Sequence, residues 1–192
     1  MRMAKTMLLA GLLFSNAHAA AAEPAEQTEK SFDEEVRSVD FAIKRFLRVE
    51  PEKPLMKNAE LRLQMARAIV ETSQNRGIPP LLLTTIVYNE STFEVTALGK
   101  LGEIGLTQVH GLAARDCELT TIEGQLDCGA KWLAHYYPIC KTWEKSLTAY
   151  ATRGLCISES ITTKERIAYR MRQWKKIQKE FEATVNTAGY GG

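Results

Sequence analysis

The fold is decided by residues 90–109, which read ESTFEVTALGKLGEIGLTQV. The apolar run 81–88 before them should form a helix that is buried on most sides, with Glu90 at its end. A glycine-punctuated turn follows, and the sequence predicts a second helix over residues 105–115 that carries Gln108. A carboxylate therefore lies at the end of a core helix, and a side-chain amide follows it in the sequence after a short loop.

Capping signals and the helical spacing of apolar residues predict further helices on both sides of this stretch. They are expected at residues 31–47, 58–77, 126–137 and 143–151, with a last one from Thr162 that carries an apolar stripe to Phe181. We find no alternating strand pattern of useful length and no internal repeat. The sequence therefore predicts a mostly α fold.

The chain divides into four segments. Residues 1–19 have the basic start, short apolar run and small-x-small ending of a cleavable signal peptide. Residues 20–30 are expected to be a flexible linker, residues 31–183 a single domain, and residues 184–192 a disordered tail. No other run is long enough to cross a bilayer, so we expect an exported, periplasmic or secreted monomer without a transmembrane segment.

The charge of the mature chain gives no case for binding nucleic acid. The full chain has 25 basic and 23 acidic residues, and removal of Arg2 and Lys5 with the leader brings the formal charge to about zero.

Four cysteines, Cys117, Cys128, Cys140 and Cys156, all lie in the second half of the chain. An even number in an exported protein favours two disulfides, and the spacing is not that of a zinc site, so no metal is expected. We expect Cys117–Cys128 and Cys140–Cys156, each closing a short connection between helices. The sequence leaves the other two pairings open.

After Glu90-Ser91 and a loop, the chain continues as Gly102-Glu103-Ile104-Gly105-Leu106-Thr107-Gln108. This order resembles the signature of the goose-type lysozyme and lytic transglycosylase family. That signature is Glu-Ser, a loop, then Gly-Ala-x-Gly-Leu-Met-Gln. The resemblance covers residues 79–156, including Gln125-Leu126 and Ala149-Tyr150. It implies a lysozyme-like helical domain, with a small irregular hairpin in the cleft.

The resemblance also implies an activity, which is cleavage of the β-1,4 bond between N-acetylmuramic acid and N-acetylglucosamine in peptidoglycan strands. Glu90 would act as general acid and then as base, leaving a 1,6-anhydromuramic end without a cofactor. Such an acid must hold its proton near neutral pH, which burial at the negative end of a helix favours. Ser91 would fix the acid, Gln108 would bind sugar, and Tyr150 would face Glu90.

Two alternatives remain open. The first is a hydrolysing muramidase that uses water and a second carboxylate, with Glu103, Asp116 and Asp127 as candidates. The second is a non-catalytic module for glycan binding or for the assembly of a secretion apparatus, because Gly99, Thr107 and Ala151 differ from the family pattern. The basic residues of the last helix are interpreted as a solvated face. They are Arg170, Arg172, Lys175, Lys176 and Lys179.

Overall fold

The computed structural model describes residues 24–109 and 111–187. In chain order the helices are α1 (Pro24–Leu47), α2 (Pro54–Lys57), α3 (Ala59–Arg76), α4 (Pro80–Ser91), the 3-10 helix η1 (Gly111–Ala114), α5 (Ile122–Cys140), α6 (Trp143–Thr152) and α7 (Ile161–Thr187). Extended structure in these residues is limited to two isolated bridges, which join Leu98 to Ile104 and Ile104 to Val109. This confirms the predicted mostly α fold.

Helix α4 forms the centre of the molecule. Its side chains Leu82, Leu83, Ile86 and Val87 are each no more than 2% exposed. Burial of one such side chain contributes about 1.5–3 kcal/mol, so this short helix is held by packing on several sides. The position of Glu90 at its end is thereby fixed by the core.

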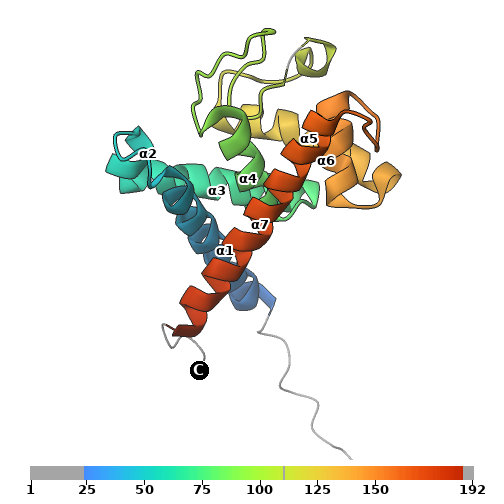
Figure 1. Cartoon of the computed structure of the whole chain (residues 1–192). Coiled ribbons are helices and arrows are strands. Elements are labelled where there is room, and N and C mark those ends of the chain that lie inside the picture. Colours follow the sequence, from blue (N-terminus) through green and yellow to red (C-terminus); the bar gives the residue numbers. More distant parts are fainter. Residues whose placement is uncertain (1–23, 110, 188–192) are drawn as a thin grey trace, which may run out of the picture.

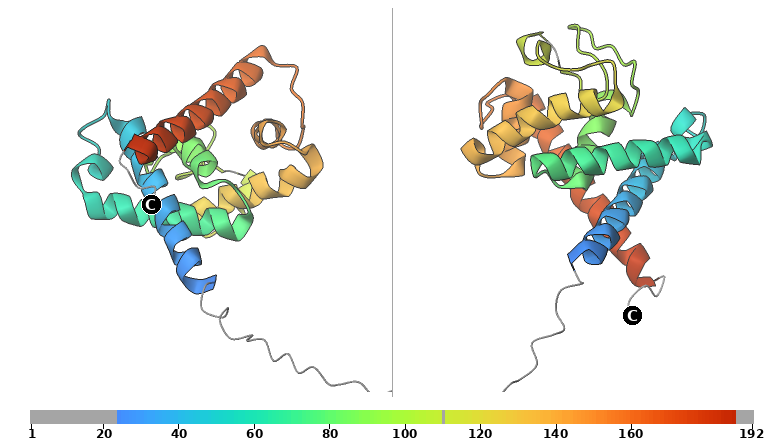
Figure 2. Two further views of the ribbon diagram at one scale, coloured as in Figure 1. Left: turned by 90° about the horizontal axis from the view of Figure 1, so that it is seen from below. Right: turned by 180° about the vertical axis from the view of Figure 1, so that it is seen from behind.

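The other helices surround α4. Helices α1, α3 and α7 all contact it, while α5 packs against α3 and α6 (Figures 1 and 2). The loop between α4 and α5, residues 92–121, rises from one end of this helical body (Figure 1). The functional residues expected from the sequence lie near that end.

The predicted caps of α3 are confirmed. The Asn58 side chain accepts a hydrogen bond from the Leu61 amide at 3.1 Å, and Gly77 ends the helix in the left-handed conformation with φ 64°. Thr121 and Thr142 cap α5 and α6 in the same way as Asn58.

Two helix ends differ from the prediction. Helix α1 begins at Pro24 and so includes most of the expected linker, because proline suits a first turn and the Ala, Glu and Gln that follow form helices well. Helix α7 begins at Ile161, where Ser160 caps it, and continues past the expected end of the domain to Thr187. The expected signal peptide 1–19 and the tail residues 188–192 lie outside the described residues.

The predicted helix over residues 105–115 is wrong. Gly105, Gln108 and Gly111 have φ angles of 71°, 49° and 61°. A right-handed helix cannot continue through residues in the left-handed region. The segment is instead an irregular loop that contains only the short helix η1.

Candidate functional site

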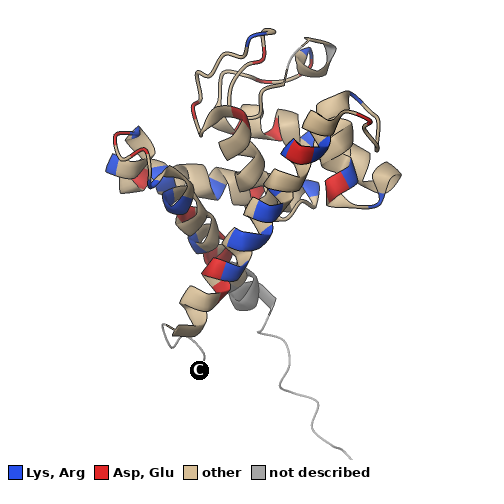
Figure 3. Ribbon diagram, viewed as in Figure 1, with Lys and Arg blue, Asp and Glu red and all other residues tan. Residues whose placement is uncertain are grey.

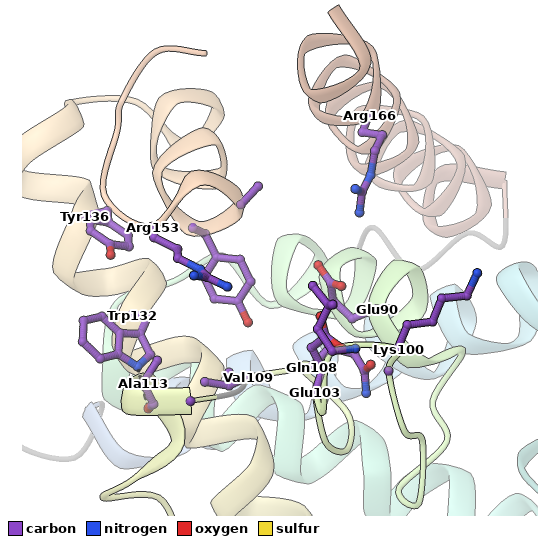
Figure 4. A pocket seen from close by; sticks show the side chains of 15 residues that line it. Glu90, Lys100, Glu103, Gln108, Val109, Ala113, Trp132, Tyr136, Arg153 and Arg166 are labelled. Carbon is purple, nitrogen blue, oxygen red and sulfur yellow. Dashed lines mark hydrogen bonds between the residues drawn. The ribbon is translucent and has the colours of Figure 1, made fainter. Parts of the chain in front are cut away.

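A pocket of about 690 Å³ lies where this loop faces α6 and α7. Figure 4 shows side chains that line it, among them Glu90 from α4, Gln108 from the loop and Trp132 from α5. Tyr150 and Arg153 border it from the end of α6, and Arg166 borders it from α7. The pocket therefore gathers polar groups from four helices and the loop.

Glu90 lies in the last turn of α4, as predicted. Thr92, in the left-handed conformation with φ 53°, ends the helix directly after it. The Glu90 side chain is 17% exposed, and Arg170 donates a hydrogen bond from Nη1 to its Oε1 at 2.6 Å. The carboxylate therefore reaches the pocket and is ion-paired with α7.

Arg170 was missed as a site residue, because it was grouped with the solvated basic residues of the last helix. Basic residues do follow one another along the ribbon of α7 (Figure 3). Among them, Arg172, Lys175, Lys176 and Lys179 are exposed. Arg170 is only 4% exposed and faces α4 instead. The signal was its spacing, since it lies three residues after Ile167 and four before Trp174 on the apolar stripe.

The hydroxyl of Ser91 bonds to the backbone around the end of α4. It is buried and lies 3.0 Å from both the Val87 and the Leu106 carbonyl oxygens, to one of which it donates at a time. Ser91 is also not among the residues of the described chain that line the pocket. It joins the end of α4 to the loop, because a serine in the last turn can reach a carbonyl four residues back.

Gln108 lines the pocket, and its amide also holds the loop. Nε2 donates hydrogen bonds to the carbonyl oxygens of Gly105 at 2.8 Å and Ala97 at 3.3 Å. The left-handed backbone of Gln108 turns its side chain back onto the loop that carries it.

Gln125 is the second amide of the site and is 3% exposed. Its Oε1 accepts a hydrogen bond from the Leu106 amide, and its Nε2 donates hydrogen bonds to the carbonyl oxygens of Val95 and Leu119. Gly105 must lack a side chain, because a Cβ there would overlap the Gln125 amide, and its φ of 71° favours glycine as well.

Tyr150 lines the pocket, and its hydroxyl donates to the Thr107 carbonyl at 2.6 Å. Burial raises the pKa of the Tyr150 phenol, and the nearby Glu90 carboxylate raises it further. Tyr150 therefore remains a neutral hydrogen-bond donor close to Glu90, and it fixes the loop at Thr107.

The three other carboxylates considered above lie in different surroundings. Glu103 lines the pocket, and its Oε2 accepts a hydrogen bond from the Leu101 amide at 2.9 Å. Asp127 pairs with Arg76 through two bonds of 2.6 and 2.7 Å and so joins α5 to α3. Asp116 is exposed in the loop. Among the three, only Glu103 lines the pocket.

Cationic side chains stand at the rim of the pocket. Arg166 points from α7 toward Glu90, and Arg153 reaches in from the opposite wall (Figure 4). Lys100 lies on the loop side. No sequence pattern selects these three residues, because they are far apart along the chain and follow no common motif.

The disulfides join Cys117 to Cys128 and Cys140 to Cys156, which is the pairing expected from the sequence. The first ties the loop to α5, and the second ties the end of α5 to the segment before α7. Disulfides of this kind fit an extracytoplasmic location.

Searches for two further features were negative within residues 24–109 and 111–187. No three His, Cys, Asp or Glu side chains gather there as metal ligands would, and no helix there is long and apolar enough to cross a membrane.

Comparison with known proteins gives one match. Neither the curated proteins nor the solved structures contain a match to this sequence. A model of the transglycosylase SLT domain matches residues 67–176, which is more than half of the chain and includes all the pocket residues named above. The chain therefore belongs to the transglycosylase SLT domain family, whose members are glycan-cleaving enzymes with peptidoglycan as substrate.

Proposed function

We propose that this protein is a lytic transglycosylase that cleaves the β-1,4 bond between N-acetylmuramic acid and N-acetylglucosamine. One observation carries the proposal: inside the region matched by the family, Glu90 ends a core helix and lines the pocket with a side chain that is 17% exposed. A general acid must reach the substrate and yet be largely shielded from water.

Glu90 would perform two proton transfers. It first gives its proton to the bridging oxygen, and the bond from that oxygen to the anomeric carbon breaks as the oxygen takes the electron pair. The Glu90 carboxylate then accepts the proton of the muramic acid 6-hydroxyl, whose oxygen bonds to the anomeric carbon. This intramolecular capture has a large effective concentration over water, so the 1,6-anhydro product forms without hydrolysis.

The remaining pocket residues support this substrate. Gln108 and Tyr150 present polar groups beside Glu90, and Trp132 offers an aromatic face for a sugar ring. The stem peptides of peptidoglycan carry carboxylates, which the cationic rim of Arg153 and Arg166 complements.

A hydrolysing muramidase is the second candidate, and one observation favours it. Glu103 is a second carboxylate in the same pocket, where it could activate a water molecule. Its hydrogen bond from the Leu101 amide already gives Glu103 a part in holding the loop, so we place this candidate second.

Export belongs to the proposal. The two disulfides support it, and the leader expected at residues 1–19 would direct it.

The test combines one variant with product analysis. Glu90→Gln keeps the shape of the side chain but cannot transfer a proton, so cleavage of purified sacculi should fall by about 10²–10⁴-fold or more. The matched control is Glu94→Gln, an exposed glutamate of the same loop region, which should leave the rate unchanged. A Glu90→Gln variant that clears sacculi near the wild-type rate would refute the proposal.

Mass spectrometry of the released muropeptides separates the two candidates. Anhydromuramic ends, one water lighter than reducing ends, support the transglycosylase. Reducing ends that disappear in Glu103→Gln would support the muramidase.

A further inference from the structure

The most unusual interaction of the site is the ion pair between Arg170 and Glu90. Arg170 Nη1 lies 2.6 Å from Glu90 Oε1, and the two side chains are 5% and 17% exposed. A charge removed from water is costly unless it is paired, so each of these side chains depends on the other. The two residues are 80 positions apart in sequence, and the packing of α7 on α4 brings them together.

Arg170 also occupies a position on the apolar stripe of its helix. Ile167 and Ile177 on the same stripe are each 3% exposed and belong to the core. An arginine that served only solubility would lie on the opposite, exposed face with Arg172. The chain therefore places a cation where packing alone favours a hydrophobic side chain, and the cation ends at Glu90.

We propose that Arg170 is a positioning residue for the reaction of Glu90, a role that rests on the function proposed above. Its guanidinium holds the Glu90 carboxyl group at the pocket wall and stabilises the negative charge that Glu90 carries after donating its proton. Arg170 takes part in the reaction through Glu90, because it does not itself line the pocket.

The role follows the charge through the two proton transfers. When Glu90 protonates the bridging oxygen, it becomes a carboxylate beside a fixed positive charge, which lowers the energy of that state. Arg170 loses and gains no proton in either step, since an arginine side chain stays charged at any working pH. When Glu90 takes the 6-hydroxyl proton, the starting state is restored.

Arg170 is one of several polar groups around Glu90. Other polar residues that line the pocket with Glu90 are Tyr150 and Arg153 from the end of α6, Arg166 from α7, and Lys100 and Glu103 from the loop. The ion pair with Arg170 is a direct contact, with Nη1 2.6 Å from Oε1 of Glu90, so removal of Arg170 should have the largest effect on the pH profile.

The experiment compares three variants of the full chain on purified sacculi. Arg170→Met removes the charge and keeps much of the volume, so kcat should fall roughly ten- to hundredfold, less than with loss of the proton-transfer group itself. The alkaline limb of its pH profile should move to higher pH. Arg170→Lys keeps a charge but not the planar fork, so it should keep the position of that limb and lose part of kcat. Arg172→Met, an exposed arginine of the same helix, should match wild type.

Stability measurements guard against a merely structural effect. Glu90→Gln/Arg170→Met contains no unpaired buried charge, so its Tm should exceed that of Arg170→Met alone. Additive Tm changes, or a loss of activity in Arg170→Met with an unmoved pH profile, would overturn the inference. An active Glu90→Gln enzyme would instead overturn the proposed function, so the two failures are distinct.

Discussion

The buried amide of Gln125 determines how the loop between α4 and α5 is held. Its Oε1 accepts from the Leu106 amide at 2.9 Å, and its Nε2 donates to the carbonyls of Val95 at 3.1 Å and Leu119 at 2.9 Å. One side chain thus satisfies three backbone groups of a segment that has almost no regular structure. The loop that carries Gln108 into the pocket depends on it.

Gln125→Ala should therefore destabilise the domain and reduce activity. The buried Leu106 amide would lose its partner, at a cost of about 1–3 kcal/mol. At this chain length each kcal/mol lowers Tm by roughly 2–4 °C. Thermal denaturation followed by circular dichroism measures the loss, with Gln64→Ala, an exposed glutamine of α3, as the control. Equal Tm values for the two variants would contradict this role of Gln125.

The sequence predicts the position of a residue where its neighbours are informative, and does not where tertiary contacts define it. The place of Glu90 at the end of a buried helix could be predicted, because an apolar run precedes it and a glycine-rich run follows it. Ser91 could not be assigned, since its hydroxyl has carbonyl partners that only the folded loop brings near. Arg170 could have been suspected from its place on the apolar stripe, but its partner lies 80 residues away.

At the scale of elements, helices were predicted well where an apolar stripe and a cap agree. Helix α3 begins after Asn58 and ends at Gly77 for the reasons read from the sequence. The loop 92–121 was not predictable in the same way, because its conformation comes from contacts with α5 and α6. Its apolar residues suggested a helix, while backbone angles at Gly105 and Gln108 prevent one.

The two disulfides should contribute differently to activity. They separate cysteines by 11 and 16 residues, and each should stabilise the fold by about 3 kcal/mol in the chain-entropy model. Replacement of Cys140 and Cys156 by serine frees the segment between α6 and α7 that carries Arg153.

We therefore expect both serine pairs to lower Tm. The 117/128 pair should lower kcat as well, because this disulfide ties the part of the loop that follows Gln108 to α5. The 140/156 pair should raise KM more than it lowers kcat, because Arg153 stands at the pocket rim. Kinetics on sacculi at a temperature where both variants are folded decide this, and identical kinetic changes in the two variants would contradict it.

At the scale of the whole molecule, α1 packs against the last turns of α7. Helix α1 precedes the matched residues 67–176, and the last turns of α7 follow them. They meet through Arg45 and Glu180, with bonds of 2.7 and 3.1 Å, and through the Phe41 and Phe181 rings, whose centroids are 5.7 Å apart. Since α7 also carries Arg170, this contact helps to hold in place the helix whose arginine pairs with Glu90.

The Arg45–Glu180 pair gives this contact a defined pH dependence. The hydrogen bond that Glu180 accepts from Arg45 lowers the pKa of the Glu180 carboxyl group below its usual value. A lowered pKa in the folded state means that the pair stabilises the protein above the unfolded pKa of about 4.3, and that the contribution is lost as the pH falls through the folded pKa. Because both side chains are partly solvated, we expect only about 0.2–1 kcal/mol.

Arg45→Met should thus lower the free energy of unfolding near neutral pH and have progressively less effect in acid. Urea denaturation between about pH 7 and pH 3 follows the change across this window. Arg37→Met on the exposed face of α1 is the control and should show no such trend. A difference between Arg45→Met and wild type that stays constant as the pH falls would show that packing of the Arg45 stem, and not its charge, holds α1 against α7.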